Sequence, residues 1–169
     1  NGEQYLKEQV KSIQDQTYQD WQLLIRDDGS RDGTVKIIQE LVAQDERIRF
    51  INQGAIENLG VIKSFHALLK YEKADLYCFS DQDDVWLPEK IALQVAEAEK
   101  HPQEVPLLVY TDLKVVDENL NVQHESMIRT QSDHANTELI QELTENTVTG
   151  GVAMINHALA DLWTGQEKH

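Results

Sequence analysis

The sequence predicts a single α/β domain in which helices cover both faces of a mostly parallel sheet. Two observations support this prediction. Five short apolar runs have the length of β-strands, and segments whose apolar residues recur with helical spacing lie between them. Alternating strands and helices form right-handed crossovers that bring strands side by side in parallel. Ligands bind at the carboxyl ends of the strands in such sheets, so the loops that follow the strands are the candidate functional segments.

The predicted strands are brief and rich in Leu, Ile, Val and aromatic residues. Continuous apolar runs of this length are typical of strands that are buried on both faces. In chain order they cover residues 23–25, 48–51, 76–79, 107–110 and 152–155.

Four helices are predicted from apolar residues that recur every three or four positions. Such spacing places these residues on one face of a helix, which can pack against the sheet. The four sets are Leu6, Val10 and Ile13; Val35, Ile38, Leu41 and Val42; Val61, Phe65, Leu68 and Leu69; and Ile91, Val95 and Ala98. The polar stretch 116–136 lacks a clear period and predicts an excursion, with or without a hairpin, before a short helix near 137–143.

The chain opens with a helical pattern and no strand before it, whereas this architecture usually begins with a strand. The first residues, Asn1, Gly2 and Glu3, also lack an initiator Met. We therefore expect residues 1–169 to form one truncated domain whose first strand precedes residue 1.

Composition excludes several classes of function. Fifteen basic and thirty acidic residues give a formal net charge of −15, which repels a phosphate backbone, so nucleic acid is not an expected partner. The single cysteine, Cys78, excludes an internal disulfide and a cysteine-based zinc site. No apolar stretch approaches the roughly 18 residues of a membrane span. The acidic residues are spread along the chain and predict a solvated surface with one concentrated site.

Two adjacent carboxylates follow the first predicted strand. Asp27 and Asp28 open the loop that leads into the second predicted helix. One interpretation is structural, since Asp, Ser and Gly form turns and either Asp32 or Thr34 can cap the helix. The other is functional, because an ionised carboxylate at position 28 can accept hydrogen bonds from a nucleotide base or ribose. A calcium loop is disfavoured, because Gln39 stands where a bidentate glutamate is required.

Three carboxylates follow the third predicted strand within four residues. Asp81, Asp83 and Asp84 repel one another, so their proximity costs stability unless a cation or hydrogen bonds offset it. Carboxylate oxygens suit Mg²⁺ or Mn²⁺, which takes one or two protein carboxylates and completes its shell with substrate phosphates. The competing explanation is compensation of the dipole of the next helix, near Pro88, and it accounts for only one or two of the three acids.

Five segments stand in a distinctive order on the predicted elements. They are residues 1–6, 27–34, 58–60, 80–86 and 149–151. Together they resemble the inverting nucleotide-sugar glycosyltransferases of family 2, across nearly the whole chain. The resemblance implies the GT-A fold, which is a Rossmann-like α/β sheet. In detail, the segments 79–86 and 146–151 are similar to bacterial rhamnosyltransferases of surface polysaccharide assembly, which implies transfer of rhamnose from dTDP-rhamnose.

The resemblance also implies roles on the donor side. Asp28 would bind the nucleotide base, with Asp27 supporting the loop. Asp81 would contact the ribose or the metal, and Asp83 would ligate the Mn²⁺ or Mg²⁺ that bridges the diphosphate. In the family a basic residue on the helix after the third segment faces the nucleotide. Lys63 is the candidate here, and an ordinary exposed lysine is an equal explanation.

On the acceptor side, Thr149, Gly150 and Gly151 look like the loop where absent side chains let a sugar approach the backbone. A tight turn into the last predicted strand is the competing explanation. Trp86 is a further acceptor-binding candidate, and packing in the core is the alternative for it. The family implies a growing polysaccharide or a lipid-linked glycan as acceptor. It also implies work in the cytoplasm at the inner face of the cell membrane, with peripheral association of the full-length protein.

The implied reaction is an in-line displacement with inversion, in which a carboxylate removes the proton of the acceptor hydroxyl. In the family this base is an Asp beyond the helix that follows the Gly-Gly loop, and the chain stops at His169, just short of that position. Asp161 and Glu167 lack the expected context, so the catalytic base is not assigned. Residues 1–169 alone are expected to bind donor weakly and to turn over poorly.

Two other functions stay open on the sequence alone. A sugar nucleotidyltransferase uses a related sheet, but it requires a glycine-rich phosphate loop with a basic residue, and residues 1–16 supply none. A noncatalytic nucleotide- or calcium-binding module is the second alternative. A calcium module would bind its ion without nucleotide, which separates it from an enzyme that binds metal together with its donor.

Overall fold

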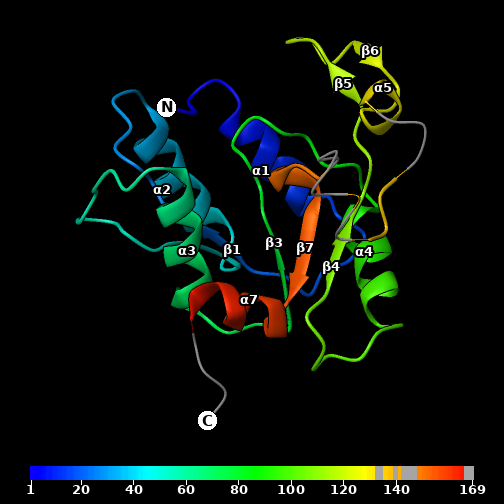
Figure 1. The fold of residues 1–169 in the computed structure, drawn as a ribbon. Coiled ribbons are helices and arrows are strands. Elements are labelled where there is room, and N and C mark those ends of the chain that lie inside the picture. The colour runs from blue at the N-terminus through cyan, green and yellow to red at the C-terminus, as the bar shows by residue number, and fades with distance from the viewer. Residues whose placement is uncertain (132–134, 139–140, 142–147, 166–169) are drawn as a thin grey trace.

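The computed structural model describes residues 1–131, 135–138, 141 and 148–165 as a mixed α/β fold (Figure 1). The five predicted strands and four predicted helices are confirmed, and the strand bounds differ by at most one residue at each end. The short helix predicted near 137–143 falls largely outside the described residues. In chain order the elements are α1 (Leu6–Gln14), β1 (Leu23–Ile25), α2 (Thr34–Gln44), β2 (Ile48–Phe50), α3 (Val61–Tyr71), β3 (Leu76–Cys78), α4 (Lys90–Ala98), β4 (Leu108–Tyr110), β5 (Val115–Val116), β6 (Val122–His124), α5 (Ile128–Gln131), the 3₁₀ turn η1 (Gly150–Val152), β7 (Ala153–Asn156) and α7 (His157–Thr164).

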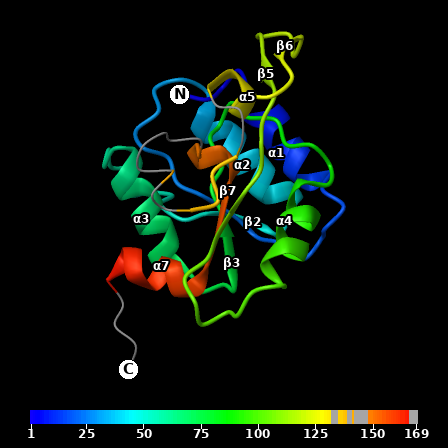
Figure 2. The ribbon, with the colours of Figure 1, turned by 45° about the vertical axis from the view of Figure 1, so that its right-hand side comes forward.

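The described strands pair as two small sheets and a hairpin. β1 pairs with β2 in parallel, with Leu23 opposite Ile48. β7 lies between β3 and β4 and runs antiparallel to both. β5 and β6 form the hairpin, which projects beyond the end of β4 (Figure 2). The α/β class and an excursion that contains a hairpin are therefore confirmed.

The direction of β7 departs from the predicted parallel arrangement. Tyr110 at the end of β4 is paired with Ala153 at the start of β7, and the Thr111 amide donates to the Val152 carbonyl oxygen at 3.3 Å. The chain therefore leaves the sheet at the carboxyl end of β4 and returns at that same end of the strands. A strand that returns there must run antiparallel to its neighbour, whereas a parallel neighbour needs a crossover to the other end of the strands.

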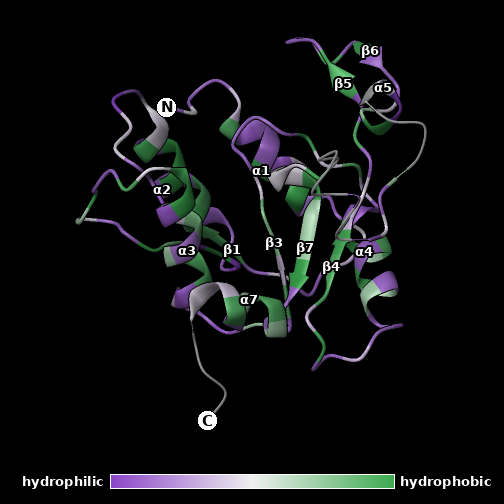
Figure 3. Ribbon diagram, viewed as in Figure 1, coloured by the Kyte–Doolittle hydropathy of each residue, from purple (hydrophilic) through white to green (hydrophobic). Residues whose placement is uncertain are grey.

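Helices cover both faces of the sheet around β3, β7 and β4. Successive side chains of a strand point to opposite faces, and β7 shows which helices lie on each. Met154 packs with the cluster that contains Ile13 of α1 and Val95 of α4, whereas Ile155 packs with the cluster that contains Leu69 of α3. Figure 3 shows β4 and β7 as mostly apolar strands between these helices. This packing holds the carboxyl end of β3 in place.

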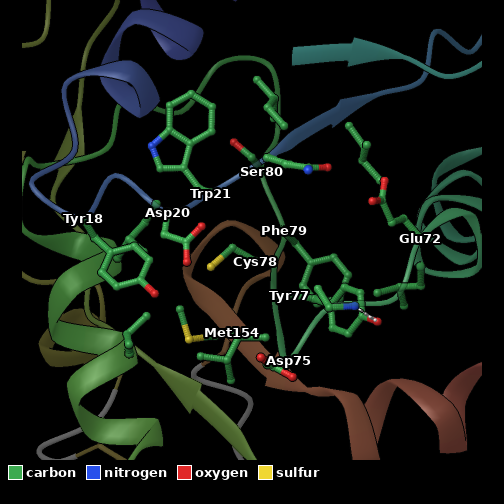
Figure 4. A pocket seen from close by; sticks show the side chains of 18 of the residues that line it. Tyr18, Asp20, Trp21, Glu72, Asp75, Tyr77, Cys78, Phe79, Ser80 and Met154 are labelled. Atoms are coloured by element: carbon green, nitrogen blue, oxygen red, sulfur yellow. Dashed lines mark hydrogen bonds between the residues drawn. The ribbon is translucent and has the colours of Figure 1, made fainter. Parts of the chain in front are cut away.

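A cavity of about 730 Å³ separates β1 from β3 (Figure 4). Within the described residues these two strands do not pair with each other. Leu23 and Leu24 line the cavity from β1, and residues 76–80 line it from β3 and the two residues after it. The sheet is interrupted at this point. The gap lies beside the start of the loop that carries Asp81, Asp83 and Asp84, the acidic loop. The strand expected before residue 1 stays a prediction.

Candidate functional site

Three loops that are far apart in the sequence meet at the carboxyl ends of β1 and β3. The Gly2 amide donates to Thr34 Oγ1 at 2.7 Å, and the Gly33 amide donates to a Glu3 carboxylate oxygen at 2.8 Å. On its other side Gly2 approaches the acidic loop, since an ideal Cβ on Gly2 would lie 3.1 Å from Gln82 Cγ. Residues before α1 therefore join the loop after β1 to the loop after β3.

Asp27 holds the turn that follows β1. Its side chain is buried, and Oδ2 accepts hydrogen bonds from the amides of Gly29 at 3.0 Å and Ser30 at 2.9 Å. Its own backbone exchanges two hydrogen bonds with the Asn52 side chain. Gly29 has a φ of 95°, which a residue with a Cβ rarely adopts. These contacts fix the backbone on which Asp28 is carried.

The carboxylate of Asp28 is bound on both oxygens. Oδ1 accepts hydrogen bonds from Arg26 Nη1 and the Leu59 amide, both at 2.6 Å, and from Ser64 Oγ at 3.1 Å. Oδ2 accepts one from the Gly60 amide at 2.9 Å. The Leu59 amide, followed by Arg26 and the other donors, outweighs desolvation and lowers the pKa of Asp28 to about 2. Asp28 is thus ionised at neutral pH and ties residues 58–60 to its loop, and Oδ2 keeps the greater unused acceptor capacity.

Arg26 is a site residue that the sequence interpretation missed. Its side chain is 5% exposed and contacts Asp28, Ser64 Oγ at 2.9 Å and the Glu57 carbonyl oxygen at 2.6 Å. A buried guanidinium requires such partners, because burying an unpaired charge is costly. The only signal in the sequence was a basic residue next to two acids at a strand end, and the partners on α3 could not be inferred from it.

Lys63 lies in the first turn of α3 and is exposed. The Lys63 side chain forms no hydrogen bond or ion pair with another described residue. Gly60, which precedes the helix, is held by Asp28 as described above. Lys63 therefore lies about one helical turn after Gly60, which Asp28 binds. Its ammonium group has no partner among the described residues.

The acidic loop after β3 concentrates negative charge. Asp81 and Asp83 are exposed and Asp84 is half-buried. Burial, and then the charge of Asp83, raise the pKa of Asp81. Burial raises the pKa of Asp84, the charges of Asp81 and Asp83 add to this, and Lys90 opposes it. No hydrogen bond joins these three side chains to other described residues. The loop therefore offers unengaged carboxylate oxygens whose ionised forms repel one another.

A divalent cation fits this set of oxygen donors. Mg²⁺ and Mn²⁺ favour carboxylate oxygens, and one or two carboxylates are enough when phosphates of a substrate complete the shell. A cation would also remove the repulsion that raises the pKa values of Asp81 and Asp84. Among the described residues, no group of three or more His, Cys, Asp or Glu side chains is arranged to hold a metal by itself. The donor set accordingly suits a cation that arrives with a diphosphate.

The turn before β7 lies against the acidic loop. An ideal Cβ on Gly150 would be 3.9 Å from Asp81 Oδ2, whereas one on Gly151 would overlap the Asp84 carboxylate. Gly151 is buried, and its φ is not positive. A Cβ at position 151 would fit only if the Asp84 carboxylate moved aside, so the constraint on this residue comes from space and not from backbone conformation. The structure brings together the acids after β3 and the glycines before β7, which the sequence placed in separate loops.

Trp86 lies in the core, where it is 7% exposed. Its ring packs in the same cluster as Ile91 and Met154, and Lys90 Nζ lies 3.9 Å from the ring centroid. Burial lowers the pKa of Lys90, while Cys78 and Asp84 oppose this. These contacts favour the packing role of Trp86 over the acceptor-binding role that was its alternative.

Of the two acids near the end of the chain, the structure describes Asp161. Asp161 lies on α7, whose first amide, that of His157, donates to the carbonyl oxygen of Asp75 just before β3. Because α7 begins beside the start of β3, Asp161 lies away from the acidic loop, which follows the other end of that strand. Glu167 lies outside the described residues.

A family model described as "Glycosyl transferase family 2" matches residues 1–162. The chain belongs to glycosyltransferase family 2. Its α/β architecture is accordingly the GT-A fold, and the resemblance inferred from the five sequence segments is confirmed. Within the described residues of this family 2 domain, no helix is both long and apolar enough to span a bilayer.

Several curated proteins are similar to the family 2 domain. A dTDP-rhamnosyl transferase, RfbG of Shigella flexneri, is 39% identical over 94 residues, which are 54% of this chain and 32% of that protein. A UDP-Glc:alpha-D-GlcNAc-diphosphoundecaprenol beta-1,3-glucosyltransferase, WfgD of Escherichia coli, is 30% identical over 57% of this chain and 36% of its own. An uncharacterized glycosyltransferase of Haemophilus influenzae is 31% identical over 68% and 35%, respectively. The matches span about a third of the length of these relatives.

Proposed function

We propose that the family 2 domain binds a nucleotide-diphosphate sugar with a divalent cation and supports transfer of the sugar, with inversion, to a glycan hydroxyl. One observation carries the proposal. The Asp81–Asp84 loop lies directly against Gly150 and Gly151. Donor phosphates held at the acids and an acceptor that approaches the glycines would therefore be neighbours, which a displacement between the two substrates requires.

On the donor side, Asp83 would ligate Mn²⁺ or Mg²⁺ and Asp81 would contact the cation or the ribose. The cation, when bound, supplies charge neutralisation of the departing nucleoside diphosphate. The Asp28 carboxylate holds the amides of Leu59 and Gly60, and it offers Oδ2 to a base or ribose donor. The unengaged Lys63 ammonium group would approach the nucleotide from α3.

On the acceptor side, Thr149, Gly150 and Gly151 would face a growing polysaccharide or a lipid-linked glycan. A turn without side chains next to the acids supports this role, because a bulky sugar ring can then reach the backbone. The general base that removes the proton of the acceptor hydroxyl would lie beyond His169. The protein that contains this domain would work at the cytoplasmic face of the membrane, in peripheral association with it.

Rhamnose from dTDP-rhamnose is the donor that we propose. Two similarities support this donor. The chain is similar to the dTDP-rhamnosyl transferase RfbG, and the sequence of residues 79–86 resembles that of bacterial rhamnosyltransferases. The similarity to the UDP-Glc-dependent WfgD supports UDP-glucose as the second candidate. Membership of family 2 disfavours the sugar nucleotidyltransferase alternative.

Titration calorimetry tests the proposed donor site. Residues 1–169 are titrated with dTDP and with UDP, each with and without MnCl₂, beside Asp83→Ala and a control, Asp15→Ala. Asp15 is an exposed acid paired with Lys11, away from the site. We expect Mn²⁺-dependent binding of dTDP that Asp83→Ala loses and Asp15→Ala retains. Mn²⁺ binding that is equally strong without nucleotide would contradict the proposal and support a noncatalytic ion-binding module.

A further inference from the structure

Helix α1 and the segment that follows it carry buried polar side chains. Gln9, Ser12 and Gln16 are 4%, 8% and 1% exposed, respectively. Gln9 and Ser12 lie one turn apart on the same side of α1, and Gln16 lies two residues beyond its end. Burying polar groups is costly unless they form hydrogen bonds. These side chains therefore require partners on the segment that packs against them.

Two of these side chains anchor the two ends of the acidic loop. Gln9 Nε2 donates to Ser80 Oγ, directly before Asp81. Ser12 Oγ accepts a hydrogen bond from the Trp86 amide at 3.0 Å. The five residues 81–85, which include all three acids, are thus fixed at both ends by side chains one helical turn apart on α1.

The third side chain fixes the loop's exit into α4. Gln16 Nε2 donates to the Leu87 carbonyl oxygen at 2.8 Å, and Gln16 Oε1 accepts from the Ile91 amide at 3.0 Å. Glu89, the residue that precedes α4, forms no side-chain capping bond. Gln16, from the segment that follows α1, therefore satisfies an N-terminal amide of α4 as a capping side chain would. The Thr17 amide adds a bond to the Pro88 carbonyl oxygen at 2.8 Å.

The acids themselves contribute nothing to holding the loop. Their side chains form no hydrogen bonds to other described residues, and their charges repel one another. Cation and diphosphate binding requires carboxylates held at a fixed spacing. We infer that Gln9, Ser12 and Gln16 are positioning residues that set the geometry of the acidic loop for cation–diphosphate binding, an inference that rests on the proposed function.

The test uses matched variants of α1. Gln9→Ala and Ser12→Ala remove the anchors, Ser12→Thr restores the hydroxyl, and Gln14→Ala removes a glutamine whose partner, Asp45, is remote from the loop. For each variant we measure amide hydrogen exchange of residues 80–91 and calorimetric binding of MnCl₂ with dTDP or UDP. We expect about fivefold faster exchange and about fivefold weaker nucleotide binding in the two anchor variants, which is the effect of one lost hydrogen bond. Ser12→Thr and Gln14→Ala should match wild type.

The outcomes separate the inference from the proposed function. If wild type binds neither nucleotide with Mn²⁺, the proposed donor site is wrong and the binding role of the anchors is wrong with it. If wild type binds but Gln9→Ala and Ser12→Ala bind and exchange like Gln14→Ala, only the inference is overturned. Should Ser12→Ala fail to fold, Gln9→Ala alone decides the inference. Among the described residues the Gln9 side chain donates a hydrogen bond to Ser80, and its loss removes neither the Ser12 nor the Gln16 hydrogen bond.

Discussion

The carboxylate of Asp84 lies so close to Gly151 that a Cβ at position 151 would overlap it. Asp84 belongs to the loop after β3, and Gly151 to the turn that enters β7. Because β7 pairs with β3, the sheet itself holds these two segments together. The contact joins the proposed donor and acceptor sides of the site, so its disturbance should affect both stability and binding.

Gly151→Ala should destabilise the fold by about 1 kcal/mol or less, because the only atoms that the new methyl group would meet belong to the Asp84 carboxylate, which must move aside. Gly150→Ala is the matched control, because its Cβ would lie 3.9 Å from Asp81 Oδ2, which is an ordinary van der Waals contact. Denaturant unfolding measures both variants. Asp84→Ala should recover most of the loss in a double variant with Gly151→Ala, and a strictly additive double variant would contradict the proposed contact.

Asp28→Asn should reduce the free energy of unfolding at pH 7 by about 2 kcal/mol, since hydrogen bonds to a charged group are lost. The folded-state pKa of Asp28 lies below its ordinary value, at about 2. Its contribution is therefore complete above about pH 4 and is lost as the pH falls toward 2. Unfolding measured at pH 7 and at pH 2 should show a large difference between wild type and variant only at pH 7. An equal difference at both pH values would contradict the role of the charge.

Asp84→Asn should stabilise the cation-free domain slightly, by about 0.5 kcal/mol at pH 7. The reason is that burial and the neighbouring acids raise the pKa of Asp84, so its ionised form is disfavoured in the folded state. The gain in stability should be present at neutral pH. It should vanish at low pH, where the Asp84 carboxyl of the wild type is protonated and therefore as neutral as the amide of the variant. Thermal unfolding without added metal measures it, and a loss of stability at pH 7 would show that Asp84 has a charged partner that stabilises it.

Lys63→Ala should weaken Mn²⁺–nucleotide binding about three- to tenfold and leave stability unchanged within about 0.5 kcal/mol, because its side chain is exposed and unengaged. Lys70→Ala, an exposed lysine at the other end of α3, is the matched control. Calorimetry on both variants distinguishes a nucleotide contact from an ordinary surface lysine. Equal affinities for the two variants would support the surface-lysine explanation.

The sequence predicted the elements well because strands and helices depend on local apolar spacing. The runs 23–25 and 76–79 became β1 and β3 almost residue for residue. The direction of β7 was not predictable in this way, because it depends on the edge at which the chain returns after β4. Apolar periodicity records burial, and it does not record the path of a loop.

The site was predictable as two acidic loops and a glycine turn, but the contacts that organise them were not. Arg26 reaches Ser64, and Ser12 reaches the amide of Trp86, across long separations in the chain. Neither pairing leaves a local signal, because a polar residue on a helix face looks the same in sequence whether it is solvated or buried. Gly151 showed only that a side chain was absent, and the structure adds that the Asp84 carboxylate occupies the space a Cβ would take.

Nuclear magnetic resonance with Mn²⁺ tests the central claim most directly. Mn²⁺ is added to isotope-labelled protein with and without dTDP or UDP, and paramagnetic broadening is mapped by residue. We predict nucleotide-dependent broadening that is strongest at Asp83 and extends across the loop contact to Gly150 and Gly151. Two results would contradict a donor site formed by the acidic loop and the turn at Gly150 and Gly151. One is broadening that is the same with and without nucleotide. The other is broadening centred away from the acidic loop, for example at Asp117 on the β5–β6 hairpin.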